Sequence, residues 1–593
     1  MLQELKNEVK KPAVLFLIGY VLLCALLQQQ YVGALKSLPS PLYGGDLYYQ
    51  MGAIEHIRSG GSVLESSSMV GTTPGYLPAY GVFVAAISWL LNTDTFHGML
   101  ACSMILLFAT YALWYFVLRE ICGDESMAVL GAIIVNVPPG DPVFKYTAFA
   151  MYFVTPIALY FFWRAWKSEE LKDYAMAGIV YGLLPLCHMV LFIGMTILAA
   201  LLFGIKIYRN KEYASFGALK KYAVFALIAA PLLMLYWYQP IFEYHLKFAY
   251  DRTHMELPDF GTLGVQLWFF SDIWARITSK IGLVIASAFV LLGFRKIKWD
   301  GFEGALFIAS LLATFSYFIT EPLLKMNFIP QYLSIMMLLP SIVVLSLGCA
   351  KEVLGGWKSG KLVLYLLLLV LAGSAFLEFQ DRTAQDKWIK VGMNQTFPEE
   401  YLGLRSYLVN NTGVDDVFLS TKEVSFALNA FSGRKLVVNR WAHQNNQYLD
   451  MPGRDRDAAV MLYGKNASMS VALMKSYEVK YVFWHAYWYN SEFIFDSSGK
   501  PVDWYDPLIT MNTDANRKML DENGVKYREM KFWLDPSGRS SDIRKYDILQ
   551  VSYENYDFSG NGPWNDGLDQ YLEEVWSYEE NGQKYAALYK VKY

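Results

Sequence analysis

Two aspartates stand in sequence contexts suited to chemistry: Asp46 in PLYGGDLYYQ and Asp141 in NVPPGDPVFKY. The glycines and prolines beside them predict that each carboxylate stands in a loop or at a broken helix end. An ionised group at membrane depth is costly unless it faces a wet cavity or a partner, so both are functional candidates. Such a carboxylate can accept a proton or ligate a hard divalent cation such as Mg²⁺ or Mn²⁺. The alternative for both is an ordinary solvated loop aspartate.

The composition predicts an integral membrane protein. Of 593 residues, 54% are hydrophobic and only 18% are charged, which excludes a disordered chain. Basic and acidic residues nearly balance, at 51 against 54, and no basic tract occurs. This charge distribution argues against a nucleic-acid partner, whose phosphates would have to be neutralised.

Apolar runs predict a polytopic α-helical membrane domain of about 11 transmembrane helices. The first run follows three lysines, lacks a cleavage pattern and is interpreted as an uncleaved helix. The stretch 174–207 is too long for one crossing, and Pro185 offers a natural break. The predicted spans are 13–32, 97–118, 127–139, 144–163, 174–186, 189–205, 222–238, 281–294, 303–319, 329–349 and 362–378.

The apolar segment 77–91 decides the orientation of everything that follows it. If it lies along the interface, more than two thirds of the loop Lys and Arg residues fall on the N-terminal side, and if it crosses, this bias reverses. The positive-inside rule therefore favours an interfacial helix and a plasma-membrane protein whose residues 34–96 and C-terminal part lie outside. We expect a membrane catalytic domain over 1–379 and an extracytoplasmic mixed α/β domain over 380–593.

The motif Asp46-Leu-Tyr48-Tyr49, with Ile54-Glu55-His56-Ile57 behind it, resembles the first-loop motif of GT-C class membrane glycosyltransferases. The chain is most similar to the catalytic subunit of oligosaccharyltransferase and its archaeal relatives. Asp141 follows the third span, where that family's second outer loop carries another acid. The class also has an interfacial helix in its first loop.

The resemblance implies that a sugar on a polyprenyl (dolichyl) phosphate is transferred, with inversion, to a glycan, lipid or protein at the outer membrane face. A carboxylate must accept the acceptor's proton, and a cation must stabilise the departing phosphate. We assign Asp46 as the base or acceptor-positioning residue, assisted by Asp141 as a second carboxylate or as a fellow ligand of Mg²⁺ or Mn²⁺. Tyr48, Tyr49 and Glu55 are the substrate-binding candidates of the motif. Metal-dependent members carry paired acids in the second loop, whereas GDPVF has one.

The phosphate-binding cation is predicted in the outer loops. Lys325 in EPLLKMNFIPQYL is the first candidate, and Lys145 and Arg252 are others. Oligosaccharyltransferases usually place an arginine near Lys325, where this chain has Asn327 and Gln331, which weakens a diphosphate donor. Snorkelling to the interface is the alternative role for Lys325.

The polar C-terminal part reads as alternating strands and helices, from DDVFLST and KEVSFALNAFSG to YAALYKVKY. The sequon-binding motif Trp-Trp-Asp-Tyr-Gly of oligosaccharyltransferases is missing, and STKEVSFALN stands at its place. Its loss favours a glycan, lipid or other acceptor over an Asn in a sequon. Trp441 and His443 are candidates for contacting sugar faces, with an aromatic core as the alternative.

Three other functions remain open. The chain could be an oligosaccharyltransferase-like protein N-glycosyltransferase with a diverged acceptor motif. It could instead be a polytopic transporter or a flippase of lipid-linked sugars, although such proteins tend to show internal repeats and mid-membrane charges, which are not seen here. A non-catalytic membrane anchor would not need Asp46.

Overall fold

The computed structural model describes residues 11–593 except 42–43, 137–142, 169, 211–215, 244–270, 272, 276, 317–334, 441–448, 489, 491, 499–500, 505–506, 535–543, 556–563 and 565. The chain forms two compact units, each built from separate stretches of sequence. The helical unit comprises Met1–Leu35, Met99–Trp237 and Asp259–Ile389. The mixed unit comprises Lys36–Gly98, Tyr238–Pro258 and Lys390–Tyr593.

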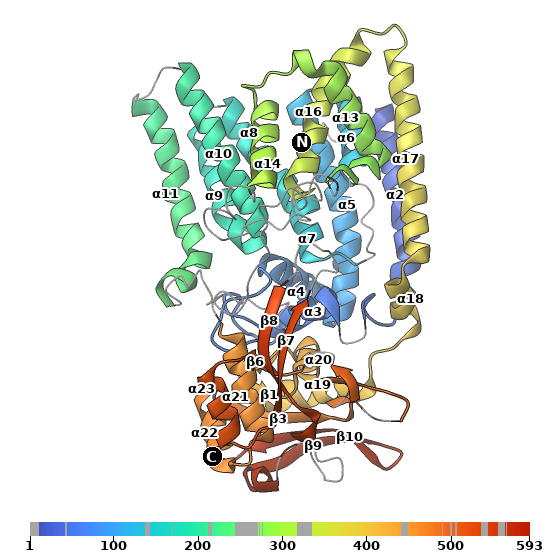
Figure 1. The fold of residues 1–593 in the computed structure, drawn as a ribbon. Helices are drawn as coiled ribbons and strands as arrows, with labels where there is room; N and C mark the ends of the chain where they lie inside the picture. The colour runs from blue at the N-terminus through green and yellow to red at the C-terminus, as the bar shows by residue number, and fades with distance from the viewer. Residues whose placement is uncertain are drawn as a thin grey trace. The chain divides into compact units, whose positions relative to one another are not determined.

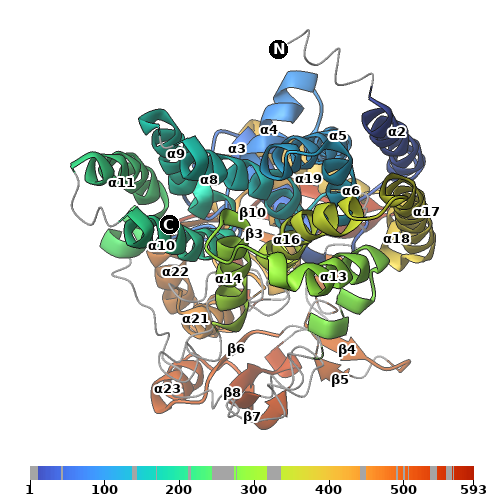
Figure 2. The same ribbon diagram turned by 90° about the horizontal axis from the view of Figure 1, so that it is seen from above.

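The helical unit contains a helix at each of the eleven predicted runs (Figures 1 and 2). They are α2 (Pro12–Val32), α5 (Thr95–Cys122), α6 (Glu125–Val135), α7 to α8 (Tyr146–Ala148, the π-helical turn Phe149–Val154 and Thr155–Ser168), α9 (Leu171–Cys187), α10 (Met189–Asn210), α11 (Phe216–Tyr238), α13 (Ile281–Gly293), α14 (Phe302–Phe315), α16 (Ile335–Gly355) and α17 (Gly360–Gln385). Within the described residues, seven helices are long and apolar enough to cross a membrane. The four others, α6, α9, α13 and α14, are shorter, so the count of eleven crossings stays a prediction.

The break between α9 and α10 lies at His188, between the predicted spans 174–186 and 189–205. Pro185 is inside α9, and the chain turns at His188, whose backbone is extended at φ −166° and ψ 125°. A proline disrupts the helix around the preceding turn and need not end it, since the following residues still donate to earlier carbonyls. His188 N donates to Leu184 O and closes that last turn.

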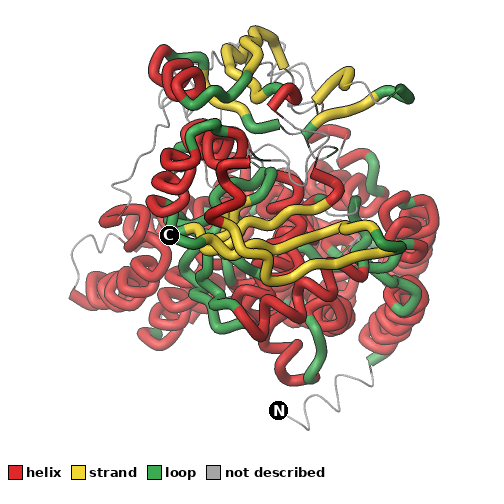
Figure 3. The backbone as a smooth tube through the Cα atoms, turned by 90° about the horizontal axis from the view of Figure 1, so that it is seen from below, coloured by secondary structure: helices red, strands yellow, loops and turns green. Residues whose placement is uncertain are grey.

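The mixed unit is built around a five-stranded sheet of order β2-β1-β3-β10-β9 (Figure 3). β1 pairs in parallel with β2 and β3, whereas β10 runs antiparallel to β3 and β9. The predicted mixed sheet is therefore present. These strands are β1 (Val417–Leu419), β2 (Lys435–Leu436), β3 (Val479–His485), β9 (Leu572–Glu580) and β10 (Gln583–Val591).

Further elements of the mixed unit are helices and two small sheets of orders β6-β8-β7 and β4-β5. They are α3 (Gly45–Arg58), α4 (Ala79–Leu91), α19 (Glu399–Asn411), α20 (Lys422–Ser432), α21 (Met451–Tyr463), α22 (Ala467–Ser476), β4 (Phe493–Phe495), β5 (Pro501–Trp504), β6 (Ile509–Met511), α23 (Asp514–Glu522), β7 (Tyr527–Leu534) and β8 (Arg544–Val551). The short helix α18 (Lys387–Asn394) spans the junction of the two units.

Residues 36–98 pack with the C-terminal residues and not with the helices that flank them in sequence. The segment even extends the sheet: Leu436 N donates to Ser68 O, and Val70 N donates to Leu436 O. The linear boundary at 379 therefore does not follow the compact units, while the functional division into 1–379 and 380–593 stays a prediction.

The predicted interfacial helix is α4. Its 13 residues span about 20 Å, short of a hydrocarbon core of about 30 Å. One face packs inward through Tyr80 and Val84, whereas Trp89 and Leu90 remain 56% and 79% exposed. A short helix with an apolar exposed face suits a position along the membrane surface, which stays a prediction.

Candidate active site

Helix α3 presents Asp46 in its first turn. Gly45, with φ +80°, provides the left-handed backbone with which the helix begins, and the extended Gly44 precedes it. A carboxylate in the first turn of a helix is favoured by the partial positive charge of the unpaired N–H groups. Asp46 is half-buried.

A tyrosine that the sequence reasoning did not select holds this carboxylate. Tyr76 Oη donates to Asp46 Oδ1 at 2.5 Å. The Tyr76 ring lies edge-on against Tyr49, with centroids 4.8 Å apart, and the Tyr49 ring stacks on Phe426 of α20. Asp46 and Tyr49, three residues apart, therefore lie on one face of α3, as helical spacing requires. The sequence feature that could have identified Tyr76 is its position in the Pro- and Gly-rich segment TTPGYLP.

A cation stands beside the start of α3. Arg440 forms a two-pronged ion pair with Glu423, and its guanidinium lies 4.2 Å from the centroid of the Phe426 ring. A Cβ added at Gly44 would lie 3.4 Å from Arg440 Nη1, so the backbone there is in contact with the guanidinium. The sequence analysis did not select Arg440, although it directly precedes Trp441, because the candidates in this segment were chosen for contact with sugar faces.

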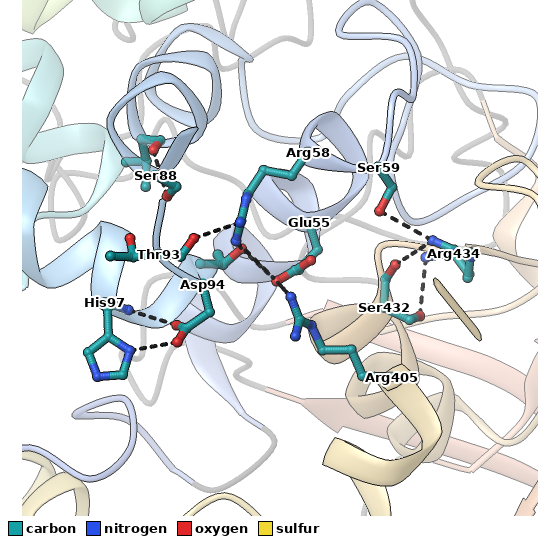
Figure 4. A network of polar contacts seen from close by, with 12 residues as sticks. Glu55, Arg58, Ser59, Ser88, Thr93, Asp94, His97, Arg405, Ser432 and Arg434 are labelled. Carbon is teal, nitrogen blue, oxygen red and sulfur yellow. Dashed lines mark hydrogen bonds and ion pairs between the residues drawn. The ribbon is translucent and has the colours of Figure 1, made fainter. Parts of the chain in front are cut away.

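Glu55, on the same helix, is engaged in a network that ties α3 to the rest of the mixed unit (Figure 4). Its Oε1 accepts from Arg405 Nη2 at 2.9 Å and from Thr95 Oγ1 at 2.6 Å, and Arg58 lies 3.9 Å away. The side chain is only 6% exposed. These contacts indicate that Glu55 positions α3, and its contact with substrate stays a prediction.

Tyr48 likewise points into the unit and is fully buried. Its ring meets Phe397 edge-on and Phe431 at a tilt, with centroids 6.3 and 6.2 Å away. Burial raises the pKa of the Tyr48 hydroxyl and of the Tyr49 hydroxyl. Of the two predicted tyrosines, Tyr49 is thus the one that contacts the Asp46 partner.

The far end of α3 is clamped by the chain just after α20. His56 Nδ1 donates to Gly433 O at 2.8 Å, and burial, the largest effect, lowers the pKa of His56. Gly433 ends α20 in the left-handed region, at φ +66°, as is common for a glycine that follows a helix. Arg434, 2% exposed, donates to Leu408 O and Thr412 Oγ1 and reaches Ser59 Oγ (Figure 4). The helix that carries Asp46 is therefore rigidly supported.

Helix α20 occupies the place of the missing Trp-Trp-Asp-Tyr-Gly motif, and all of its residues are buried. Lys422 Nζ lies 2.7 Å from Asp455 Oδ2 of α21, and the two side chains are 1% and 0% exposed. Lys422 Nζ also donates to Pro507 O, and Ile509 N donates to Asp455 Oδ2. This helix is part of the core of the mixed unit and carries a buried ion pair.

Lys145, one of the candidate cations, is half-buried and directly precedes α7. The remaining predicted site residues fall outside the described residues, and the structure does not place them. They are Asp141, Arg252, Lys325, Gln331, Trp441 and His443. Among the residues that the structure does describe, no group of three or more His, Cys, Asp or Glu side chains is arranged to hold a metal ion. A Mg²⁺ or Mn²⁺ ion held by Asp46 and Asp141 thus stays a prediction.

No family model matches the chain. The uncharacterized protein MJ1080 of Methanocaldococcus jannaschii is 43% identical over 131 residues, which are 22% of this chain and 97% of that protein.

Solved structures show a looser likeness. One is the Archaeoglobus fulgidus oligosaccharyltransferase tethered with an acceptor peptide containing the NVT sequon, at 13% identity and a TM-score of 0.45, covering 93% of this chain and 76% of that one. The same enzyme in complex with Zn and sulfate has 13% sequence identity and a TM-score of 0.47, and the match covers 94% of this chain and 79% of that one. ArnT from Cupriavidus metallidurans bound to undecaprenyl phosphate has 7% sequence identity and a TM-score of 0.48, and the match covers 91% of this chain and 98% of that one. Both are GT-C glycosyltransferases, the class that the first-loop motif resembled.

Proposed function

We propose a function for this chain from its own site and motif. The chain belongs to the same family as the uncharacterized protein MJ1080 of Methanocaldococcus jannaschii. It is a membrane glycosyltransferase that moves a sugar from a polyprenyl (dolichyl) phosphate to a glycan, lipid or protein acceptor at the outer membrane face. The observation that carries the proposal is the half-buried Asp46 carboxylate, oriented by Tyr76 at the start of α3 and close to the cation Arg440.

The reaction is a single displacement with inversion. The acceptor oxygen or nitrogen attacks the anomeric carbon, the bond from that carbon to the phosphate oxygen breaks, and the lipid phosphate leaves with the electron pair. Asp46 takes the acceptor's proton, which requires an ionised and correctly aimed carboxylate. The Tyr76 hydroxyl provides that aim through its bond to Oδ1.

The rigid support of α3 serves the same reaction. Small displacements of a catalytic group cost large factors in rate, because the reacting atoms must approach within about 3 to 3.5 Å. Arg405 and Gly433 hold the C-terminal end of α3 through the neighbouring Glu55 and His56, and Tyr76 holds Asp46 at its beginning. A positive group near the start of α3 also suits an anionic donor, and Arg440 joins Lys325 and Arg252 as a candidate for that role.

The decisive experiment is a transfer assay with purified protein in nanodiscs and a panel of radiolabelled sugars on dolichyl and undecaprenyl phosphate. We expect transfer by the wild type and none by Asp46→Asn, with a loss of about tenfold or more for Tyr76→Phe, since a hydrogen bond to a charged group contributes about 1.5 to 3 kcal/mol. Glu580→Gln, which changes an exposed carboxylate of β9, is the matched control and should retain full activity. Full transfer by Asp46→Asn would refute the assigned role, and failure with every donor would favour a transporter or flippase.

The orientation needs its own test. Cysteine introduced at Ser498 in the mixed unit should react with an impermeant maleimide added to intact cells, whereas cysteine at Lys298 in the helical unit should react only after lysis. Both positions are exposed, so accessibility within the fold is matched. Labelling of Lys298→Cys in intact cells would show that the topology is the reverse of the proposed one and that the site does not lie at the outer face.

A further inference from the structure

The helical unit contains a cavity of about 560 Å³ where α5, α8 and α10 end and α14 begins. Three cations line it, Lys167, Lys206 and Arg209. Two tryptophans, Trp163 and Trp166, form part of the wall. The proposed transfer reaction uses none of these residues.

Lys206 is the innermost of the cations and is 8% exposed. Its Nζ donates to Ala165 O at 3.3 Å and to Tyr174 Oη at 3.2 Å, and it lies 5.3 Å from the centroid of the Trp166 ring. Lys167 Nζ, nearer the rim, lies 4.4 Å from the centroid of the Trp163 ring. An ammonium kept inside a bundle of apolar helices is costly, and such groups usually serve a ligand or a pathway.

The cavity lies at the end of the bundle where α2 begins. Lys11, just before α2, forms an ion pair with Glu125 at the start of α6, which follows the end of α5. Val32, from which the chain leaves for the segment with Asp46, is at the opposite end of α2. Under the positive-inside rule, the cavity faces the cytoplasmic leaflet, and its tryptophans stand where such rings concentrate, at the level of lipid headgroups.

Two carboxylates, Glu120 and Glu303, complete the polar lining. Three positive and two negative side chains do not suit a bare anion alone. They suit a phosphate attached to a group that donates hydrogen bonds, such as hydroxyls or an amine, because the carboxylates can accept from that group. The volume is within the range of small-molecule sites, about 300 to 1,000 Å³.

We propose that this cavity binds the headgroup of a phospholipid of the cytoplasmic leaflet, with its phosphate among Lys167, Lys206 and Arg209. The hydroxyl-bearing or amine-bearing end of the headgroup lies toward Glu120 and Glu303. Trp163 and Trp166 contact the glycerol and the upper acyl chains. The site is separate from Asp46 and does not depend on the transfer reaction.

The test titrates delipidated protein in detergent with phosphatidylglycerol or phosphatidylcholine and counts bound lipids by native mass spectrometry. The variant Lys167→Gln/Arg209→Gln removes two lining cations, both of which reach the surface. The control Arg295→Gln/Lys298→Gln removes two exposed cations that precede α14 and do not line the cavity. Each lining cation should contribute about fivefold in affinity, so we expect about 25-fold weaker phosphatidylglycerol binding by the first variant and less than twofold by the second.

Equal weakening in both double variants would reduce the effect to general surface charge and overturn the proposal. Equal affinity for phosphatidylcholine, whose headgroup has no hydrogen-bond donor, would also overturn it. If glycerol 1-phosphate displaced the lipid at a concentration equal to that of the lipid, the cavity would be a site for a soluble phosphate ester instead. The single exposed variant Lys167→Gln should show about a fivefold loss, and a full-strength affinity there would contradict the assigned role of Lys167.

Discussion

The contact between α3 and α20 predicts that Gly52→Ala destabilises the mixed unit, although alanine is the better helix former. A Cβ added at Gly52 would lie 2.4 Å from Asn429 Oδ1 and 2.8 Å from Asn429 O. Asn429 is 1% exposed and cannot shift freely, because its Nδ2 donates to Ser67 O at 2.8 Å and to Arg434 O at 2.9 Å.

The two opposing effects have known sizes. Replacing a helical glycine by alanine favours the helix by about 1 kcal/mol. Overpacking costs about 1 to 3 kcal/mol, and loss of the two buried hydrogen bonds of Asn429 adds about 1 kcal/mol each. We therefore expect a net loss of about 2 to 4 kcal/mol in the free energy of unfolding. For a unit of this size, that lowers the melting temperature by about 3 to 7 °C.

The assay is thermal unfolding of the detergent-solubilised protein, with Gly403→Ala as the matched control. Gly403 is also a helical glycine of the mixed unit, in α19, but a Cβ there would meet only Trp576 Cζ2 at 3.6 Å, an ordinary contact. The control should be neutral or stabilised by up to about 1 kcal/mol. If Gly52→Ala were stabilised like the control, α3 would not pack on α20 as closely as described, and the rigid support of Asp46 would be refuted.

Two further predictions concern the same unit. Burial lowers the pKa of His56, so its stabilising contribution is complete above about pH 6.5 and declines as the pH falls toward the lowered pKa. The variant His56→Asn keeps a donor for Gly433 O, so its melting temperature should fall less than that of the wild type between pH 7 and pH 5. An identical fall in both proteins would exclude His56 as the cause. Lys422→Met leaves the Asp455 carboxylate buried without its cation and should cost about 3 to 5 kcal/mol, whereas Lys422→Met/Asp455→Leu should recover part of it. A double variant as unstable as the single one in thermal melts would contradict this coupling.

Local pattern determined most of the secondary structure. Each apolar run became a helix, and KEVSFALNAFSG became α20 with Gly433 at its left-handed end, because periodicity and capping act over a few residues. The predicted break after Pro185 is present at His188, between α9 and α10. The motif from Asp46 to Ile57 lies on one helix, α3.

The sequence by itself therefore predicted a membrane protein with an α/β part and a carboxylate, Asp46, in a loop or at a helix end, and the structure has it in the first turn of α3. Tertiary structure alone decided what surrounds that carboxylate. Tyr76 reaches Asp46 from 30 residues away, and His56 meets Gly433 across 377 residues. Tertiary structure also assigned Glu55 to an ion-pair network and joined residues 36–98 to the C-terminal sheet. Such contacts depend on how surfaces that are distant in the sequence fit together and on which polar groups need hydrogen-bond partners once they are buried. The spacing of neighbouring residues in the sequence predicts neither.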